Sequence, residues 1–339
     1  MDNKITKQRF YNLMSYDWIL MIVILLVGIF VFELLYAFFG VEVTTGQNFK
    51  YYYDINVDSS LESGLLDALL LENETFSEDV LLINGEVVND EANILNTRMR
   101  VQEGDVIITD VVEEGEGKAV RAKSLIDSGV QIPIYDFEKL LLDGREYLAT
   151  FLKDEFSSLS YEEKLKLTED KDNLSVDKMD EAFLLRYKKD NRFRTEEQKK
   201  IGLEYERKRI YKLVDEFKDF SHLLEVGDEK GILFRYTKYS QRRELATEES
   251  AKEALDTMIK TEIAIGKENA IYGLKVENLK GGKHNPSEFF KVLGRADAKD
   301  VVILVFDFLS YQRELQFETV CYINSVVRAC SDIYEKEIV

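Results

Sequence analysis

The 339-residue chain has few of the residues from which metal sites and nucleophilic enzymes are most often built: 2 cysteines, 2 histidines and 1 tryptophan. A structural zinc site needs a cluster of Cys and His ligands, and Ser-His or Cys-His catalysis needs a histidine beside the nucleophile. His222 and His284 are far apart in the sequence, and each is expected to be a surface side chain. Cys321 and Cys330 fall on opposite sides of one predicted helix, so both are expected to be free, buried thiols. The composition therefore argues against zinc-dependent and histidine-assisted catalysis.

Basic residues are outnumbered, because 45 Lys and Arg stand against 64 Asp and Glu and give a formal net charge of −19. Binding to nucleic acid needs clustered positive charge on one surface, so no nucleic-acid partner is expected. The one basic run, at residues 186–220, is interleaved with acidic residues, and it favours a solvated helix face over a nucleic-acid or lipid patch. Apolar residues make up 45% of the chain, which is enough for a packed core.

The longest apolar run lies near the N-terminus, at residues 18–39, and it is long enough to cross a bilayer as a helix. Three basic residues precede this run, and none follows it before Lys50. The positive-inside rule therefore predicts a cytoplasmic tail at 1–16, a transmembrane signal anchor at 17–41 and an extracytoplasmic remainder, in a single-pass protein of the cell membrane. A cleaved signal peptide is the alternative, but the run is long for a signal and no small-residue cleavage site or lipid-accepting cysteine lies next to it.

Glu33 is the one charged residue within the apolar run. One interpretation is that its side chain extends toward the outer membrane interface, where the carboxylate meets water. The other is a polar contact with a second membrane helix, since charged residues within membrane spans are costly and often functional. Glu33 is therefore a candidate for contact with another membrane helix, and both interpretations stay open.

The chain beyond the apolar run alternates between strand and helix patterns. Strands are expected at Phe49–Asp58, Asp79–Val88 and Asp105–Asp110. Helices are expected between them, at Ser59–Leu71 and from Asn89 to about residue 101. This βαβαβ order predicts three parallel strands that lie side by side.

The middle of the chain changes to helical patterns, and the last part returns to α/β. Strands are expected at 231–239, 269–278 and 300–309, and a final amphipathic helix at 313–336. The predicted fold is therefore an α/β lobe formed by 49–135 and 266–339, with a mainly helical lobe inserted at 136–265.

Acidic residues gather around the third predicted strand, at positions 103, 105, 110, 113, 114 and 116. Asp105 and Asp110 stand about 15 Å apart at opposite ends of that strand, so they cannot bind the same ion. The loop after Asp110 lacks the spacing of an EF-hand and favours a solvated acidic loop, so neither a metal nor a cofactor is expected. Asp110 alone stands at the carboxyl end of a strand, where open α/β sheets bind ligands.

Three segments resemble parts of the extracytoplasmic solute-binding proteins. "ILNTRMRVQEGDVIITD" (94–110) is similar to the helix, turn and strand that close the first lobe in that family, and "AIYGLKVE" (270–277) and "VVILVFDFL" (301–309) are similar to its return to that lobe. The resemblance implies a two-lobed fold that binds a small solute between the lobes and delivers it to an importer.

A cleft of this kind would be lined by polar and tyrosine side chains, and the candidate ligand-binding residues are Asp110, Ser124, Tyr135 and Tyr236. The expected function is a membrane-tethered extracytoplasmic binding or accessory module, related to transport, whose partner is a small-molecule solute or a membrane protein. The alternative is a scaffold or interaction protein of a membrane complex that keeps the fold without a ligand. An enzyme is not expected, because no convergent nucleophile, base and stabiliser can be named.

Overall fold

The computed structural model describes residues 7–8, 11, 18–39, 47–55, 75–78, 80–88, 104–111, 121–127, 134–187, 191–238, 269–291, 294–307 and 317–335. The predicted helices at 59–71 and 89–101 and the acidic loop after Val111 lie outside these ranges. The chain divides into two compact units. Unit 1 consists of Met1–Glu42 with Arg186–Lys200, and unit 2 of Val43–Leu185 with Ile201–Val339.

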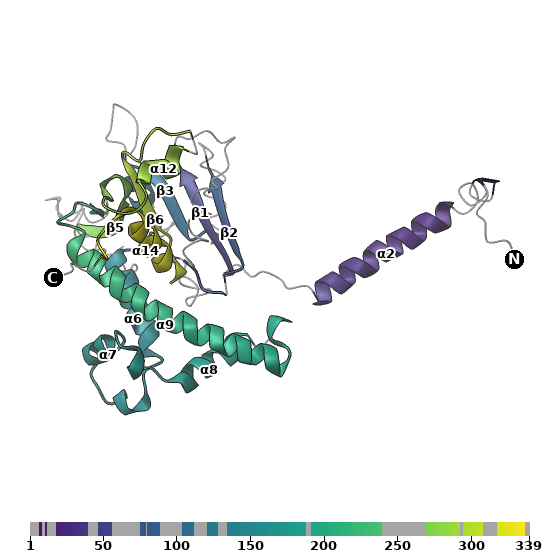
Figure 1. Cartoon of the computed structure of the whole chain (residues 1–339), viewed down its shortest axis with the longest axis horizontal. Coiled ribbons are helices and arrows are strands. Elements are labelled where there is room, and N and C mark those ends of the chain that lie inside the picture. Colours follow the sequence, from purple (N-terminus) through teal and green to yellow (C-terminus); the bar gives the residue numbers. More distant parts are fainter. Residues whose placement is uncertain are drawn as a thin grey trace, which may run out of the picture. The chain divides into compact units, whose positions relative to one another are not determined.

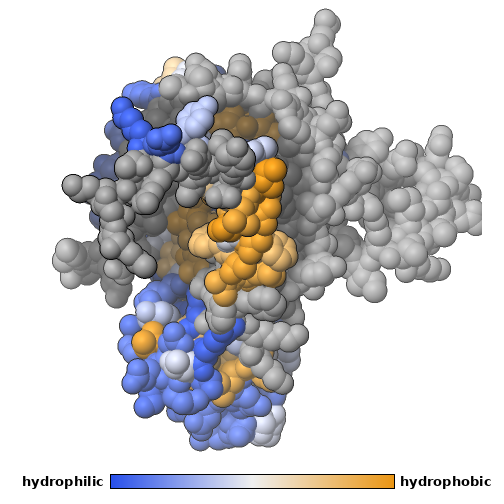
Figure 2. All heavy atoms as spheres, turned by 90° about the vertical axis from the view of Figure 1, so that its right-hand side faces the viewer, coloured by the Kyte–Doolittle hydropathy of each residue, from blue (hydrophilic) through white to orange (hydrophobic). Residues whose placement is uncertain are grey.

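Helix α2, Trp18–Phe39, confirms the apolar N-terminal helix that the sequence predicts. Its stretch Trp18–Leu35 is the one candidate membrane span among the described residues, and none of it is buried inside the protein. Its surface is apolar (Figure 2). A helix of this length and composition can serve as a single-pass anchor or as a signal sequence.

A six-stranded mixed sheet forms the centre of unit 2, in the order β2-β1-β3-β6-β5-β4 (Figure 1). The strands are β1 Asn48–Asp54, β2 Leu82–Val87, β3 Val106–Asp110, β4 Leu233–Tyr236, β5 Ala270–Lys275 and β6 Val301–Val305. β1 pairs in parallel with β2 and with β3, as the βαβαβ pattern predicts. β6 is antiparallel to β3 and to β5, and β4 is antiparallel to β5. The carboxyl ends of β1, β3 and β5 therefore share one edge of the sheet with the starts of β4 and β6.

Alternating side chains place an apolar core on each face of the sheet. Tyr51 and Tyr53 of β1 belong to the larger core, whereas Tyr52 belongs to the smaller one. This alternation is the two-residue period of a strand that is covered on both faces. β3 and β6 are buried at every position, which explains their nearly continuous apolar sequences.

Helices cover both faces. The α-helices of unit 2 and its border are α5 Arg121–Asp127, α6 Phe137–Ala149, α7 Tyr161–Leu167, α8 Val176–Arg186, α9 Glu196–Val226, α12 Pro286–Lys291 and α14 Glu318–Cys330, and the short 3-10 helices are η2 Asp154–Phe156, η3 Lys171–Asn173, η4 Asn191–Phe193 and η6 Val276–Asn278. Residues of α6, α9 and α14 share the larger core, and α5 packs on the other face. The middle of the chain is helical, as predicted, but α6 and α9 contribute to the same core as the sheet. The predicted two-lobed division remains a prediction.

Charged side chains are buried between the helices of the larger core. Arg209 and Glu206 are each at most 2% exposed and form an ion pair with a 3.0 Å N–O distance. Arg209 also donates a hydrogen bond to the hydroxyl of Tyr147 on α6. On α14, the buried carboxylate of Glu318 accepts hydrogen bonds from the hydroxyl and the backbone N–H of Ser77. These contacts tie α6 to α9, and α14 to the residues before β2.

Asp105 precedes β3 at the edge opposite the carboxyl ends of the parallel strands. Its carboxylate accepts a 2.8 Å hydrogen bond from the backbone N–H of Lys50. Burial raises the pKa of this carboxyl to about 7, the Lys50 N–H opposes the rise, and the nearby Glu318 adds to it. Burial also raises the pKa of Glu318, against the opposing effect of Arg209. Asp105 is thus a structural carboxyl that changes charge near neutral pH.

Candidate functional site

The carboxyl edge of the sheet combines a topological switch with buried charges. The chain leaves β1 for β2 on one side and returns to β3 on the other, and open α/β sheets bind ligands at such a point. Asp54 ends β1 and forms a 2.9 Å ion pair with Arg121, the first residue of α5. Thr109, which pairs with Asp54 across the two strands, donates to the same carboxylate at 3.5 Å. α5 was not predicted from the sequence, so this ion pair was missed.

Asp110 ends β3 and faces a different partner. Its carboxylate accepts a 2.6 Å hydrogen bond from the guanidinium of Arg295, and both side chains are mostly buried. Arg295 also donates to the carbonyl of Lys299 at 2.6 Å, so the loop before β6 is held against the end of β3. Asp110 therefore lies at the carboxyl edge, as predicted, but its charge is neutralised by an arginine 185 positions away. In this state it positions a loop rather than acting as a free base.

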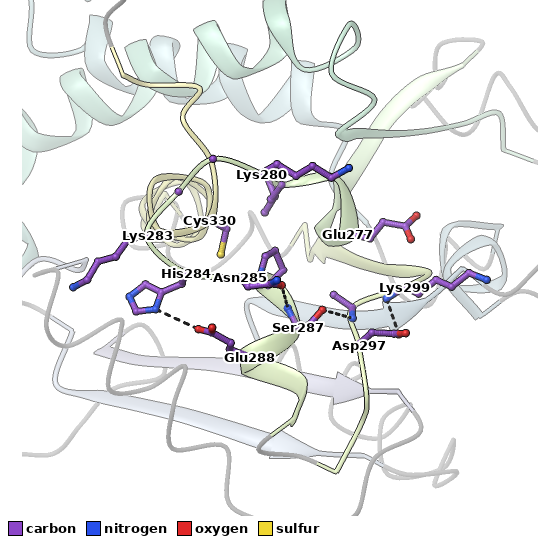
Figure 3. Close-up of a pocket in the computed structure, with 15 residues that line it drawn as sticks. Glu277, Lys280, Lys283, His284, Asn285, Ser287, Glu288, Asp297, Lys299 and Cys330 are labelled. Atoms are coloured by element: carbon purple, nitrogen blue, oxygen red, sulfur yellow. Dashed lines mark hydrogen bonds and ion pairs between the residues drawn. The ribbon is translucent and has the colours of Figure 1, made fainter.

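A cavity of about 600 Å³ lies at this edge, between the loop after β5, the loop before β6 and the end of α14 (Figure 3). Its lining residues are Glu277, Leu279–Glu288, Asp297, Ala298, Lys299 and Cys330. Lys283 and Lys299 extend toward opposite sides of it, and the side chain of Asn285 points toward Ser287 (Figure 3). A second cavity of about 400 Å³ adjoins it and shares Lys280 and Gly281. Both volumes fall in the range of small-molecule sites.

Hydrogen bonds among the lining residues hold the cavity walls in place. The amide oxygen of Asn285 accepts from the backbone N–H of Ser287 at 3.0 Å, and the hydroxyl of Ser287 accepts from the N–H of Ala298 at 3.3 Å. The second of these bonds joins α12 to the loop before β6. Nδ1 of His284 lies 3.7 Å from a carboxylate oxygen of Glu288, and both residues line the cavity. The cavity thus has polar, oriented walls and charges of both signs around its opening.

Cys330 contributes the only sulfur among the cavity's lining residues. Burial, together with the negative charge of the nearby Glu288, raises the pKa of its thiol to about 12. The side chain is therefore a neutral thiol at physiological pH, and a neutral thiol is a poor nucleophile. Cys321 and Cys330 are both free and buried, which confirms the prediction for the two cysteines. The cavity is chemically suited to binding through hydrogen bonds and charge.

Two adjacent glycines allow the cavity wall to form. Gly281 has φ +94°, a backbone conformation that other residues rarely adopt, and it bridges to Ser331 after α14. A Cβ atom on Gly282 would lie 2.4 Å from the backbone nitrogen of Ser331. The sequence signal for this wall is the Gly-Gly pair that follows the strand predicted at 269–278.

Gly282→Ala is expected to lower the free energy of unfolding by about 1–3 kcal/mol, because the loop or the end of α14 has to move to admit the methyl group. Chemical denaturation of the full chain measures this change. Lys283→Ala, in the same loop but exposed, is the matched control and is expected to change stability by less than about 0.5 kcal/mol. Equal free energies of unfolding for the two variants would contradict the close approach of Gly282 to the backbone of Ser331.

The structure does not bring the four predicted ligand residues together. Asp110 is at the carboxyl edge, and Ser124 is exposed on α5. Tyr135 and Tyr236 are buried at the opposite edge, where their hydroxyls donate to Asp143 at 2.7 Å and to Asp127 at 2.6 Å. The ends of β4 and β6 lie at that edge because these strands run antiparallel to β1, β3 and β5. The hydrophobic pattern of a strand does not show its direction, so the sequence did not predict this placement.

No metal site is formed by the described part of the chain, where no group of three or more His, Cys, Asp or Glu side chains is placed to hold an ion. The acidic loop that follows Val111 lies outside the described residues. Comparison with known proteins adds no relative: no protein-family model, no curated protein and no solved structure matches this chain. The fold and the site define the class, a mixed α/β protein with an apolar N-terminal helix and a polar cavity at the carboxyl edge of its sheet.

Proposed function

We propose that this chain is a single-pass membrane-tethered binding module that holds a small polar ligand outside the cytoplasm. The observation that carries the proposal is the cavity of about 600 Å³ at the carboxyl edge of the sheet, whose lining residue Lys299 accepts a hydrogen bond from Arg295, the partner of Asp110. Open α/β sheets bind their ligands at this edge, and the walls here are joined by hydrogen bonds before any ligand arrives. The resemblance to solute-binding proteins supports the same role, and a transport-related partner follows from it.

The residues around the cavity favour a polar ligand that carries charge. Three lysines and the acidic residues Glu277, Glu288 and Asp297 line its walls, and no Phe, Tyr or Trp is among its lining residues. Apolar ligands and stacked sugar rings depend on aromatic contacts, which this cavity lacks. Charged amino acids, short peptides and other zwitterionic solutes match the mixture of positive and negative groups.

The proposed tether predicts the behaviour of the whole chain in membranes. An N-terminally tagged chain is expected to remain uncleaved and to stay with membranes after alkaline extraction. Protease added from outside is expected to digest the large unit. Replacing Ile24 and Val27 with arginine is expected to release the chain, because each arginine near the centre of a span costs about 3 kcal/mol. Wild-type protein in the soluble fraction, or a tag lost by cleavage, would contradict the anchor.

Ligand binding is tested by thermal unfolding of the full chain in nanodiscs against amino acids, short peptides, sugars and metal ions. A ligand present at about 100 times its dissociation constant stabilises the folded state by about 2.7 kcal/mol. We expect saturable stabilisation by at least one charged polar solute. If no compound stabilises the chain, the binding role fails, and the ligand-free scaffold becomes the better description.

A further inference from the structure

The smaller of the two cavities is lined by four separate parts of unit 2. Its volume is about 400 Å³, and Lys280 and Gly281 line both this cavity and the larger one. The other lining residues follow α9, precede β4, belong to η6 or follow α14, and they are Lys230, Ile232, Asn278, Ser331 and Asp332. The two cavities therefore adjoin at Lys280 and Gly281.

One positive charge of the smaller cavity is not compensated. Lys230 donates a 2.9 Å hydrogen bond to a carboxylate oxygen of Asp332 and lowers the pKa of that carboxyl, so these two charges neutralise one another. Lys280 is exposed and has no acidic partner among the described residues. An anion in the cavity therefore meets an ammonium group that no carboxylate already binds. Because water screens an exposed charge, a second group is needed to hold such an anion in one position.

Ser331 provides a second group, because its hydroxyl has no hydrogen-bond partner among the described residues. The residue lines the smaller cavity and is 4% exposed. Its backbone is fixed, since its N–H donates to the carbonyl of Val327 at 2.8 Å and the residue pairs with Gly281 in an isolated bridge. A buried hydroxyl without a partner is costly, and a hydrogen bond to a bound group offsets that cost.

We propose that the smaller cavity binds the carboxylate of the solute whose remaining part lies in the larger cavity, an inference that rests on the proposed function. Lys280 supplies the positive charge, and the Ser331 hydroxyl donates a hydrogen bond to one carboxylate oxygen. The single charge of a carboxylate matches the one lysine of this cavity that has no acidic partner among the described residues. A doubly charged phosphate would leave excess negative charge beside Asp332. Amino acids and short peptides with a free carboxyl group are therefore the expected class of solute.

Acetate and acetamide test this subsite before the complete solute is known. The two compounds are similar in size and shape, but only acetate carries a negative charge at pH 7. Thermal unfolding of the full chain in nanodiscs is measured against each compound at constant ionic strength. We expect saturable stabilisation by acetate and none by acetamide, because a ligand that binds only the folded state stabilises it. Equal stabilisation by the two compounds, or stabilisation by neither, would overturn the carboxylate subsite.

Two substitutions assign the binding of acetate to named residues. Lys280→Gln is expected to raise the dissociation constant of acetate at least about tenfold, and Ser331→Ala about fivefold, because each removes a hydrogen bond to a charged group. Lys166→Gln on α7 removes the same charge as Lys280→Gln at another exposed position and is expected to leave the dissociation constant unchanged. Equal acetate binding by Lys280→Gln and Lys166→Gln would contradict the proposal.

The unfolding temperature without acetate separates a ligand site from a site for structural water. Ser331→Ala is expected to unfold at the wild-type temperature or above it, because the hydroxyl has no partner to lose among the described residues. A lower unfolding temperature would show that a fixed water already binds this hydroxyl, and it would overturn the proposal. Failure of the acetate titration alone contradicts only the carboxylate subsite, whereas failure of the solute screen contradicts the binding role.

Discussion

Replacing Arg209 with methionine is expected to lower the free energy of unfolding by about 3–5 kcal/mol. The cost arises because the carboxylate of Glu206, which is 1% exposed, would remain in the core without its counter-ion. The hydroxyl of Tyr147 would also lose the hydrogen bond that Arg209 donates. Urea denaturation of the wild-type and variant chains, in the same detergent or nanodisc, measures the difference.

A double variant separates loss of the pair from loss of volume. Arg209→Met combined with Glu206→Leu removes both charges and is expected to recover most of the lost stability, because a buried ion pair often exchanges for apolar residues at little net cost. A single Arg209→Met variant that loses less than about 1 kcal/mol would show that solvent reaches this pair. If the double variant is no more stable than Arg209→Met alone, the lost stability comes from altered side-chain packing and not from the unpaired charge of Glu206.

The second large effect is a change of stability with pH at Asp105. Its pKa in the folded chain is about 7 against an ordinary value of 3.8, so between about pH 4 and pH 7 the folded state binds a proton that the unfolded state has released. The contribution of this group therefore lowers stability as pH rises through that window and is constant above it. Asp105→Asn keeps an oxygen that accepts from the Lys50 N–H and removes the charge. The variant is expected to match the wild-type chain at low pH and to exceed it by up to about 4 kcal/mol at pH 8.

Denaturation of both chains at pH 5 and pH 8 tests this prediction. Glu155→Gln, at an exposed position of η2, is the control and is expected to follow the wild-type curve at both values. Some pH dependence is expected to remain in Asp105→Asn, because burial also raises the pKa of Glu318. If Asp105→Asn is more stable than the wild-type chain by the same amount at pH 5 and at pH 8, its added stability does not come from the protonation of Asp105.

The sequence predicts the features that depend on local patterns. The apolar run at 18–39 is helix α2, the βαβαβ order places β1, β2 and β3 in parallel, and the middle of the chain is helical. Each of these follows from hydrophobic periodicity or from a long apolar run, and both are properties of neighbouring residues. Strand direction in the second half was not predictable in this way, since an antiparallel and a parallel strand share the same pattern.

The site was harder to predict because its contacts join distant parts of the chain. Asp110 meets Arg295, and Cys330 shares a cavity wall with the loop after β5. No periodicity links such positions, and only the assembled sheet brings them to one edge. Tyr135 and Tyr236 were predicted to contact a ligand because aromatic side chains can stack on one. In the structure both are buried, and their hydroxyls donate hydrogen bonds within the protein.

The binding role is tested most directly by affinity measurements on the full chain with its cavity narrowed. Lys280 is exposed and lines both cavities, so Lys280→Trp is expected to obstruct them without disturbing the core, and Lys166→Trp on α7 is the matched control. For the best ligand from the thermal screen, isothermal titration is expected to give equal affinities for the wild-type and control chains. For Lys280→Trp the loss is expected to be at least about tenfold, which corresponds to about 1.4 kcal/mol. Unchanged affinity in Lys280→Trp would contradict a ligand site at this edge of the sheet.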